Sequence, residues 1–355
     1  MRLKKIQKIL REKEIDCLIL SSLAHDDKNL LYLLKEYIKN CLLIIPKKGK
    51  CRVLVPEMEY GYAKKALDVP VFKFEKGFSK DIKKLLLKLN AKHLAINKGA
   101  ISVKEYESLK KIFKYKISDL GDCLLNQRSV KEKDEIDKIS CACRFTDKVF
   151  ESLVSNIGSL KKEEDVKKYL MKQMFNYGGV SFNPVVASGK NSGYVHYEGS
   201  NKKMGKGFML IDFGVMYKGY CSDMTRTIYI GRPQKKEIEL YDFLLEIQEK
   251  ACKMIRPGVN SKDIDLFVRE KMGKYEAFYN HGLGHGVGLN VHEYPFISKN
   301  SNFVLKEGMV LTVEPGIYFP GKKGIRIEDT VLVTKKGNRI LTKSKKNLIE
   351  IKKRV

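Results

Sequence analysis

The chain of 355 residues is 43% hydrophobic and 31% charged, which is typical of a folded soluble protein and long enough for two domains. No apolar run approaches the roughly 18 residues that a membrane span requires, and the N-terminal stretch is typical of an amphipathic helix rather than a signal peptide, so we expect a cytoplasmic protein with no membrane partner. The net charge of +27 would suit nucleic-acid binding, but the lysines are spread along the whole chain without a basic block, which favours a lysine-rich surface for solubility.

Residues 1–124 are predicted to form a mixed α/β domain. Strand-like apolar runs occur at 17–22, 41–46, 52–56, 71–75 and 93–97, and they alternate with helix-like segments around 57–67, 79–90 and 102–113. This part of the chain contains only two histidines, His25 and His93, and no dense cluster of acids. We therefore expect it to support a site located elsewhere.

Residues 125–355 show the same order of elements twice. Helices are predicted at 131–157 and 162–176, followed by strands at 180–187, 209–213 and 225–230; helices at 235–255 and 261–272 are then followed by strands at 283–291, 309–314 and 325–333. Two halves of this kind imply a pseudo-symmetric domain with a cleft between them.

A first pair of acids lies in the strands of the first half. Asp212 ends an apolar run, where an unpaired charge is costly, and Asp223 begins the next strand eleven residues later. A hairpin that turns near Tyr217-Lys218 would place the two carboxylates opposite each other, with Cβ atoms about 5 Å apart. Because two such charges repel by about 4 kcal/mol at about 4 Å and an effective dielectric of about 20, we expect a positive group between them.

A second pair of acids lies in the second half. Glu314 and Glu328 flank a turn that contains Pro320-Gly321, so a hairpin centred near residue 321 would place them opposite each other. Strand alternation puts Arg326 on the same face as Glu328. A single acid at a strand end is often only an exposed side chain, but two opposed pairs in apolar strands are poorly explained in that way.

Three of the chain's six histidines, His281, His285 and His292, fall within twelve residues between the two acid pairs, in a glycine-spaced segment. Glycine allows the backbone to approach a ligand closely, and imidazole binds transition metals without adding negative charge. A lone histidine is more often structural. Four carboxylates and a histidine suit a pair of divalent ions rather than a thiolate zinc site, and hydrolysis is the default chemistry of such a centre.

These residues resemble the pita-bread metallopeptidases, a family that includes aminopeptidase P, prolidase and methionine aminopeptidase. The resemblance is carried by Asp-Phe-Gly at 212–214, Ser-Asp-Met-Thr-Arg-Thr at 222–227, the segment 281–293, Thr-Val-Glu-Pro-Gly-Ile-Tyr at 312–318 and Gly-Ile-Arg-Ile-Glu-Asp at 324–329. The segment with Arg128 and Lys131 is similar to the opening of the family's catalytic domain. The resemblance implies an α+β fold, with a creatinase-like N-terminal α/β domain (1–124) and a pseudo-twofold pita-bread catalytic domain (125–355).

The resemblance also implies a metal-binding role for each acid. Asp212 would bind one of two divalent ions, Asp223 and Glu328 would bridge both, and His285 and Glu314 would complete the second site. We expect manganese, with cobalt, iron or zinc as alternatives. Glu314 would also shuttle the proton of a water that bridges the ions.

Three more histidines and an arginine are expected to act around the metals. By the same resemblance, His196 would bind the substrate or the tetrahedral intermediate, and His292 would donate to the carbonyl oxygen. His281 would line the substrate pocket, and Arg326 would hold the carboxylate ligands in place.

Specificity depends on one departure from the family pattern. Methionine aminopeptidases generally lack the N-terminal domain, so the length favours a proline-directed peptidase. Many dipeptidase-like relatives carry an arginine where this chain has Phe296, and that arginine suits the substrate's terminal carboxylate. We therefore expect a homodimeric Xaa-Pro aminopeptidase that acts on peptides with proline in the second position, with an Xaa-Pro dipeptidase (prolidase) as the alternative. A metal-free pita-bread binding module and a nucleic-acid-binding protein are the remaining hypotheses.

Overall fold

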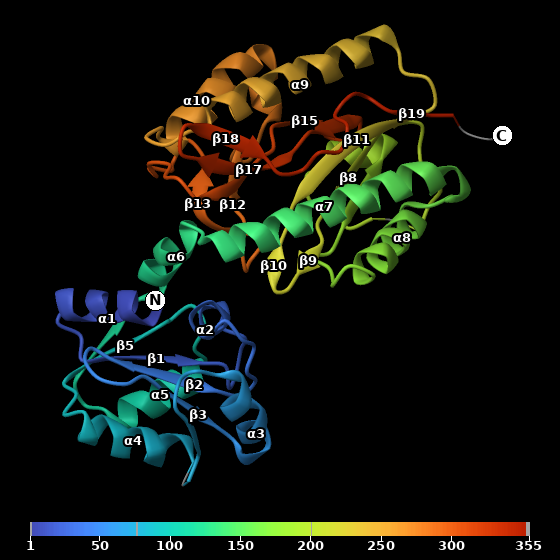
Figure 1. Cartoon of the computed structure of the whole chain (residues 1–355). Helices are drawn as coiled ribbons and strands as arrows, with labels where there is room; N and C mark the ends of the chain where they lie inside the picture. Colours follow the sequence, from blue (N-terminus) through green and yellow to red (C-terminus); the bar gives the residue numbers. More distant parts are fainter. Residues whose placement is uncertain (1, 76, 200, 353–355) are drawn as a thin grey trace. The chain divides into compact units, whose positions relative to one another are not determined.

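The structure is a computed structural model that describes residues 2–75, 77–199 and 201–352. The chain divides into two compact units, Met1–Gln127 and Arg128–Val355 (Figure 1). Within the described ranges, no helix is both long enough and apolar enough to cross a membrane.

The first unit is built on one six-stranded sheet, and it has the mixed α/β character expected from the sequence. Its strands are β1 (Cys17–Ser21), β2 (Leu42–Pro46), β3 (Arg52–Val55), β4 (Val71–Lys73), β5 (His93–Ile96) and β6 (Lys116–Asp119), in the order β4-β3-β2-β1-β5-β6. Its helices are α1 (Arg2–Glu12), α2 (Lys28–Leu34), α3 (Glu57–Ala66), α4 (Phe78–Lys88) and α5 (Val103–Ile112), and α6 (Gly121–Ser129) follows. β1 and β2 are buried along their whole length, which explains their continuous apolar sequences. α2, α6 and β6 lie outside the predicted elements.

The first half of the second unit contains the two predicted helices and a four-stranded sheet, which combines the three predicted strands with a fourth, unpredicted strand from residues 350–351. The helices are α7 (Lys133–Asn156) and α8 (Glu163–Phe175), and the sheet has the order β19-β11-β8-β7. Its strands are β7 (Val185–Ser188), β8 (Gly207–Phe213), β11 (Met224–Ile230) and β19 (Glu350–Ile351), with the small hairpin β9 (Met216–Tyr217) and β10 (Tyr220–Cys221) between β8 and β11. Apolar side chains of both helices pack with those of β8 and β11 into one core cluster.

The second half repeats this arrangement with α9 (Lys235–Met254) and α10 (Ser261–Met272). Its sheet has the order β13-β12-β14-β17-β18, with strands β12 (Gly284–Gly286), β13 (Glu293–Ile297), β14 (Val310–Val313), β17 (Asp329–Thr334) and β18 (Gly337–Ile340), and β15 (Gly316–Phe319) and β16 (Lys323–Arg326) form a separate hairpin. A second core cluster lies between these helices and strands. In Figure 1 the helices of the two halves lie on the outside of this unit with the strands between them, as the pseudo-symmetric prediction requires.

The hairpin of the first acid pair has a different register from the predicted one. Asp212 lies opposite Thr225 rather than opposite Asp223. The chain turns at Lys218-Gly219, one residue later than predicted, and both turn residues have positive φ, 49° and 81°. A two-residue hairpin turn with two positive φ angles favours glycine at its second position, and this explains the choice of turn. Asp223 therefore lies two residues along from the partner of Asp212, on the same face of the sheet.

The hairpin of the second acid pair has the predicted register. Val313 pairs with Asp329 where β14 meets β17, and the same register continues in the β15–β16 hairpin. Glu314 and Glu328 lie between these two paired regions. The predicted turn centre near residue 321 is therefore confirmed.

Three predicted strands are shorter than their apolar runs. The run at 180–187 is a strand only in β7, the run at 283–291 only in β12, and the run at 325–333 is divided between β16 and β17. At the second of these, a Cβ on Gly286 would lie 2.2 Å from the carbonyl oxygen of Tyr294, and one on Gly288 would lie 2.2 Å from Oε1 of Glu293. These two glycines allow the chain to pack closely against the start of β13, whereas the sequence predicts that they allow the backbone to approach a ligand.

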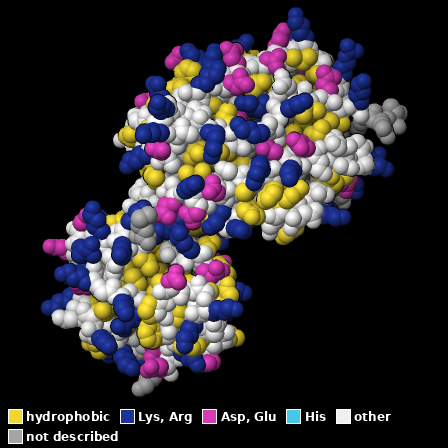
Figure 2. Space-filling view, in the orientation of Figure 1, with side chains coloured by type: hydrophobic (Ala, Val, Ile, Leu, Met, Phe, Trp, Pro, Cys, Tyr) yellow, Lys and Arg dark blue, Asp and Glu magenta, His cyan; other side chains and the backbone are white. Residues whose placement is uncertain are grey.

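Lysine and arginine side chains are distributed over the visible face of each unit and do not gather in one stripe (Figure 2). Several of them pair with acids one helical turn away, as Lys250 does with Glu246. This distribution fits the lysine-rich surface expected from the sequence.

Candidate active site

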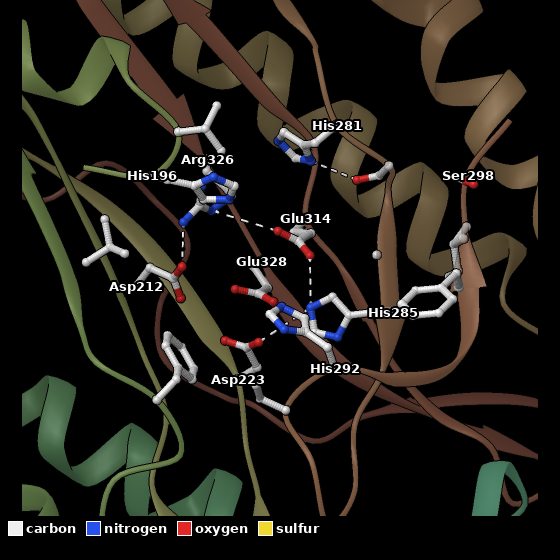
Figure 3. A pocket seen from close by; sticks show the side chains of 18 residues that line it. His196, Asp212, Asp223, His281, His285, His292, Ser298, Glu314, Arg326 and Glu328 are labelled. Atoms are coloured by element: carbon white, nitrogen blue, oxygen red, sulfur yellow. Dashed lines mark hydrogen bonds and ion pairs between the residues drawn. The ribbon is translucent and has the colours of Figure 1, made fainter. Parts of the chain in front are cut away.

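A cavity of about 430 Å³ in the second unit is lined by side chains from both halves (Figure 3). All nine site residues predicted from the sequence line it, namely His196, Asp212, Asp223, His281, His285, His292, Glu314, Arg326 and Glu328. Asp212 lies in β8, and Asp223 directly precedes β11. His285 lies in β12, Glu314 directly follows β14 and Glu328 directly precedes β17. The fold thus brings together residues that the sequence placed in separate motifs.

Three of the four acids are incompletely neutralised by the protein. Asp212 Oδ1, Asp223 Oδ1 and Glu328 Oε1 are buried, and none has a hydrogen-bond partner among the described residues. Burial raises the pKa of Asp212, and burial followed by repulsion from neighbouring carboxylates raises the pKa of both Asp223 and Glu328 well above the ordinary range. Because an unpaired buried carboxylate oxygen is costly, these three atoms form a site suited to a cation.

The fourth acid, Glu314, is paired with the metal-ligand candidate His285. Glu314 Oε1 lies 3.2 Å from His285 Nε2, and the same nitrogen lies 3.6 Å from Asp223 Oδ2. Burial would raise the pKa of Glu314, but the hydrogen bond and charge of His285 lower it to about 2. The other ring nitrogen, Nδ1, lies 3.2 Å from the carbonyl oxygen of Gly286, so Nε2 is the atom that faces the acids.

Arg326 is buried beside the acids and connects them. Its Nη2 donates to Asp212 Oδ2 at 2.5 Å, and its Nε donates to Thr225 Oγ1 at 3.0 Å. Thr225 in turn donates to Glu328 Oε2 at 2.8 Å. One guanidinium therefore holds Asp212 directly and Glu328 through a threonine.

A hydrogen-bond chain from Arg326 fixes the state of His281. Arg326 Nη1 donates to the hydroxyl of Tyr318 at 3.0 Å, and that hydroxyl lies 3.0 Å from His281 Nε2. His281 Nδ1 lies 2.7 Å from the carbonyl oxygen of Gly282, which only accepts, so Nδ1 carries the proton. Burial lowers the pKa of His281, so the ring is neutral and its Nε2 accepts from Tyr318. Both ring nitrogens of His281 are therefore engaged by the protein.

The two other histidines are exposed at the cavity. The His292 ring lies 4.2 Å from the His285 ring in an edge-on arrangement, with an interplanar angle of 73°. Burial, and then the neighbouring His285, lower the pKa of His292, which keeps its imidazole neutral. His196 lines the cavity from the loop after the short 3₁₀ helix Gly189–Gly193.

Sequence reasoning did not identify Thr225 and Tyr318 as site residues. Strand alternation would have found both, since Thr225 lies two residues after Asp223 and Tyr318 lies four residues after Glu314. Apart from Phe296, it also did not identify the mainly apolar wall, which consists of Phe182, Val185, Val195, Val291, Phe296, Ile297 and Ser298, with Gly282 and Gly284. These wall residues come from separate loops and strands, so no local pattern marks them.

The donor set of the cavity fits divalent metal ions. One ligand atom each from Asp223, His285 and Glu328 lies within 4.8 Å of the others, and these are the only residues in the described ranges that form such a group of three. Asp212 and Glu314 line the same cavity and add two further carboxylates to this set. Carboxylate oxygens with one imidazole nitrogen are ligands that suit Mn, Co, Fe or Zn ions.

Family models match both units of the chain. Residues 137–335 match metallopeptidase family M24, and residues 2–130 match the creatinase/prolidase N-terminal domain. The chain is 37% identical to an Xaa-Pro dipeptidase of Pyrococcus furiosus over 355 residues, which are 98% of this chain and 99% of that protein.

Solved structures are similar over almost the whole chain. The structure of the prolidase from Pyrococcus horikoshii matches with a TM-score of 0.90 and 34% identity, covering 98% of this chain and 99% of that one. An X-Pro aminopeptidase from Thermotoga maritima matches with a TM-score of 0.89 and 31% identity, covering 97% of this chain and 100% of that one. Both the fold and the two-domain organisation expected from the resemblance are shared with these proteins.

Proposed function

The chain belongs to metallopeptidase family M24, and from this we propose that it is an Xaa-Pro dipeptidase, which hydrolyses the bond before proline in a dipeptide. One observation carries the metal-dependent chemistry: four carboxylates and His285 converge in one cavity, and three buried carboxylate oxygens there have no partner among the described residues. The choice of dipeptides is supported by the relative of 37% identity, which is itself an Xaa-Pro dipeptidase and matches nearly end to end.

Two divalent ions, with manganese as the first candidate, would be held by Asp212, Asp223, His285, Glu314 and Glu328. When bound, such a pair lowers the pKa of a water molecule and polarises the substrate carbonyl. The ions would also neutralise the oxygens of Asp212, Asp223 and Glu328 that the protein leaves unpaired.

The chain's own residues would position the peptide and move its protons. Glu314 would take up a proton from the attacking water and deliver it to the leaving proline nitrogen, a role helped by its ionised state beside His285. His292 would donate to the carbonyl oxygen of the substrate, and His196 would bind the substrate from the other wall. Arg326 would keep the carboxylates in place, and the network through Tyr318 would keep Arg326 in place.

A second candidate, the Xaa-Pro aminopeptidase favoured by the sequence, keeps one observation on its side. Phe296 lines the cavity and is 40% exposed, at the position where an arginine was expected for a dipeptidase. Arg326 is the only lysine or arginine among the described residues that line the cavity, and its donors are occupied by Asp212, Thr225 and Tyr318. On this reading the cavity would lack a dedicated partner for a terminal carboxylate.

The two candidates differ in how they treat a longer substrate. We expect the manganese-loaded enzyme to hydrolyse Leu-Pro with a kcat/KM at least about tenfold higher than for Leu-Pro-Ala, a difference of about 1.4 kcal/mol in transition-state binding. Equal or faster cleavage of Leu-Pro-Ala would replace the dipeptidase by the aminopeptidase. Leu-Ala serves as the control. Cleavage of Leu-Ala without cleavage of either proline-containing peptide would exclude both the dipeptidase and the aminopeptidase.

A further inference from the structure

Arg128 and Lys131, at the start of the second unit, form ion pairs with Glu293, a residue that has no role in the proposed mechanism. Neither is among the described residues that line the cavity. Arg128 Nη2 lies 2.5 Å from Glu293 Oε2, and Lys131 Nζ lies 2.9 Å from Glu293 Oε1. All three side chains are at most 3% exposed. We call these three residues the buried triad.

The buried triad holds an ionised carboxylate inside the protein. Burial would raise the pKa of Glu293, but Lys131 and then Arg128 lower it. Ion pairs that are buried in this way often contribute little net stability compared with a well-packed apolar core. Their directional contacts nevertheless hold the three side chains in one geometry. A role in positioning therefore explains the buried triad better than a role in stability does.

The buried triad adjoins the cavity through the backbone of Glu293. Glu293 directly follows His292 in the chain; His292 lines the cavity, whereas the Glu293 carboxylate is buried against Arg128 and Lys131. Gly286, which follows the metal-ligand candidate His285, pairs with Glu293 in the β12–β13 ladder. Glu293 is thus the chain neighbour of His292 and the cross-strand partner of the residue that follows His285.

Two further contacts make this arrangement specific. Gly288 lacks the Cβ that would lie 2.2 Å from Glu293 Oε1, so the loop can close over the carboxylate. The backbone N–H of Lys131 donates to the carbonyl oxygen of Gly308 at 2.9 Å, which anchors the cationic segment to the second half. The loop 288–292 therefore packs on the Glu293 carboxylate, and this carboxylate is paired with a cationic segment that is itself anchored to the second half.

We propose that the buried triad is a positioning device for His292. Arg128 and Lys131 fix the Glu293 carboxylate, and this fixes the backbone that carries the His292 imidazole beside His285. Arg128, Lys131 and Glu293 would then act through His292 without contacting substrate. This inference rests on the proposed peptidase function for its kinetic test only.

Glu293→Gln is the direct test, because it keeps the shape of the side chain while removing its charge and replacing one acceptor by a donor that faces cations. We expect kcat to fall by about 10- to 100-fold, the range typical for a misplaced active-site group, with KM and metal content changed by less than about threefold. Asp147→Asn is the matched control, since Asp147 is also buried and accepts from the backbone of Lys343 and Ser344 outside the cavity. Asp147→Asn should leave kcat unchanged, although it should lower the stability of the fold by an amount similar to that of Glu293→Gln.

A double-mutant cycle with His292→Ala separates positioning from a general structural role. If Glu293 acts through His292, adding Glu293→Gln to His292→Ala should lower kcat by less than about twofold. An equal loss of kcat in both backgrounds would overturn the proposal. Should Glu293→Gln fail to fold, Lys131→Met removes one cation while Arg128 stays paired, and the same cycle applies.

A crystal structure of the Glu293→Gln variant gives a readout that does not need activity. We expect the His292 ring to move from its 4.2 Å separation from the His285 ring. An unmoved ring would overturn the positioning role. If the wild-type enzyme cleaved no Xaa-Pro substrate, the proposed function would fail, while this structural comparison would still decide the role of the buried triad.

Discussion

At the scale of single residues, the acids of the cavity differ in how far the protein already neutralises them. Asp212 has an ion pair with Arg326, and Glu314 has a hydrogen bond from His285. Asp223 and Glu328 each leave one oxygen without a partner among the described residues, and neighbouring carboxylates raise their pKa beyond the effect of burial. These two acids are the ones that depend most on a bound cation, which agrees with the bridging role proposed for them.

Asp223→Asn should therefore affect both metal positions. The amide keeps the shape of the side chain but removes the negative charge, so we expect metal content to fall and kcat/KM to drop by at least about 100-fold, since even groups that only support metal ligands are worth about 10- to 100-fold. Metal content is measured by atomic spectroscopy on the dialysed protein.

The control is Asp242→Asn, an exposed acid on α9 that should change neither quantity. The metal-free Asp223→Asn protein should also resist urea better than the metal-free wild type, because the repulsion among the carboxylates is relieved. A variant with near-normal turnover would show that Asp223 is not a metal ligand.

At the scale of elements, the turn between β9 and β10 decides which residues of the first half face each other. Its first central residue, Lys218, has φ 49°, and its second, Gly219, has φ 81°. Only glycine adopts such angles without strain, while asparagine tolerates them better than lysine does.

Substitutions in this turn should change stability in opposite directions. We expect Gly219→Ala to lower the free energy of unfolding by about 1–2 kcal/mol and Lys218→Asn to raise it by a few tenths to about 1 kcal/mol. Because the chain has no tryptophan, urea denaturation is best followed by circular dichroism. A neutral Gly219→Ala would mean that the chain does not turn here with two positive φ angles.

A carboxylate in the first unit ties strand β5 to the segment before β1. Asp16 Oδ1 lies 2.5 Å from Lys47 Nζ, and Asp16 Oδ2 accepts from the backbone of Lys92 and His93. Burial would raise the pKa of Asp16, but these hydrogen bonds lower it below the ordinary range of an aspartate.

The stabilisation from Asp16 should consequently depend on pH. A carboxyl group whose pKa is lower in the folded state stabilises the fold above the unfolded-state pKa, and this contribution is lost as the pH falls through the folded-state pKa. Hydrogen exchange in β5 should therefore be faster in Asp16→Asn than in the wild type above about pH 5, and the difference should shrink below about pH 4. A difference that stays constant or grows on acidification would contradict this assignment.

At the scale of the whole molecule, the architecture of the second unit could be predicted because each half repeats two amphipathic helices followed by apolar strands. The ligand candidates could be predicted because acids are conspicuous inside apolar strands. The register of the first hairpin could not, since it depends on a turn whose centre differs by a single residue from the predicted one. Contacts such as Arg128 to Glu293, which are 165 residues apart, leave no local pattern at all.

The choice between dipeptides and longer peptides shows a second limit of sequence reasoning. A single position, Phe296, favoured the aminopeptidase, whereas similarity over the full length favours the dipeptidase. One side chain in the wall determines only one contact with the substrate, whereas specificity depends on all the residues that line the cavity. Several of these residues come from loops that no local sequence pattern identifies.

Metal reconstitution tests whether the cavity in the second unit is a two-metal peptidase centre. We expect the protein to bind about two Mn²⁺ ions per chain by calorimetry, to lose Xaa-Pro hydrolysis on chelation and to regain it with Mn²⁺ or Co²⁺. Full hydrolytic activity in protein shown to be free of metal, or the absence of any divalent-ion binding that depends on Asp223 and Glu328, would show that the cavity is not a two-metal centre.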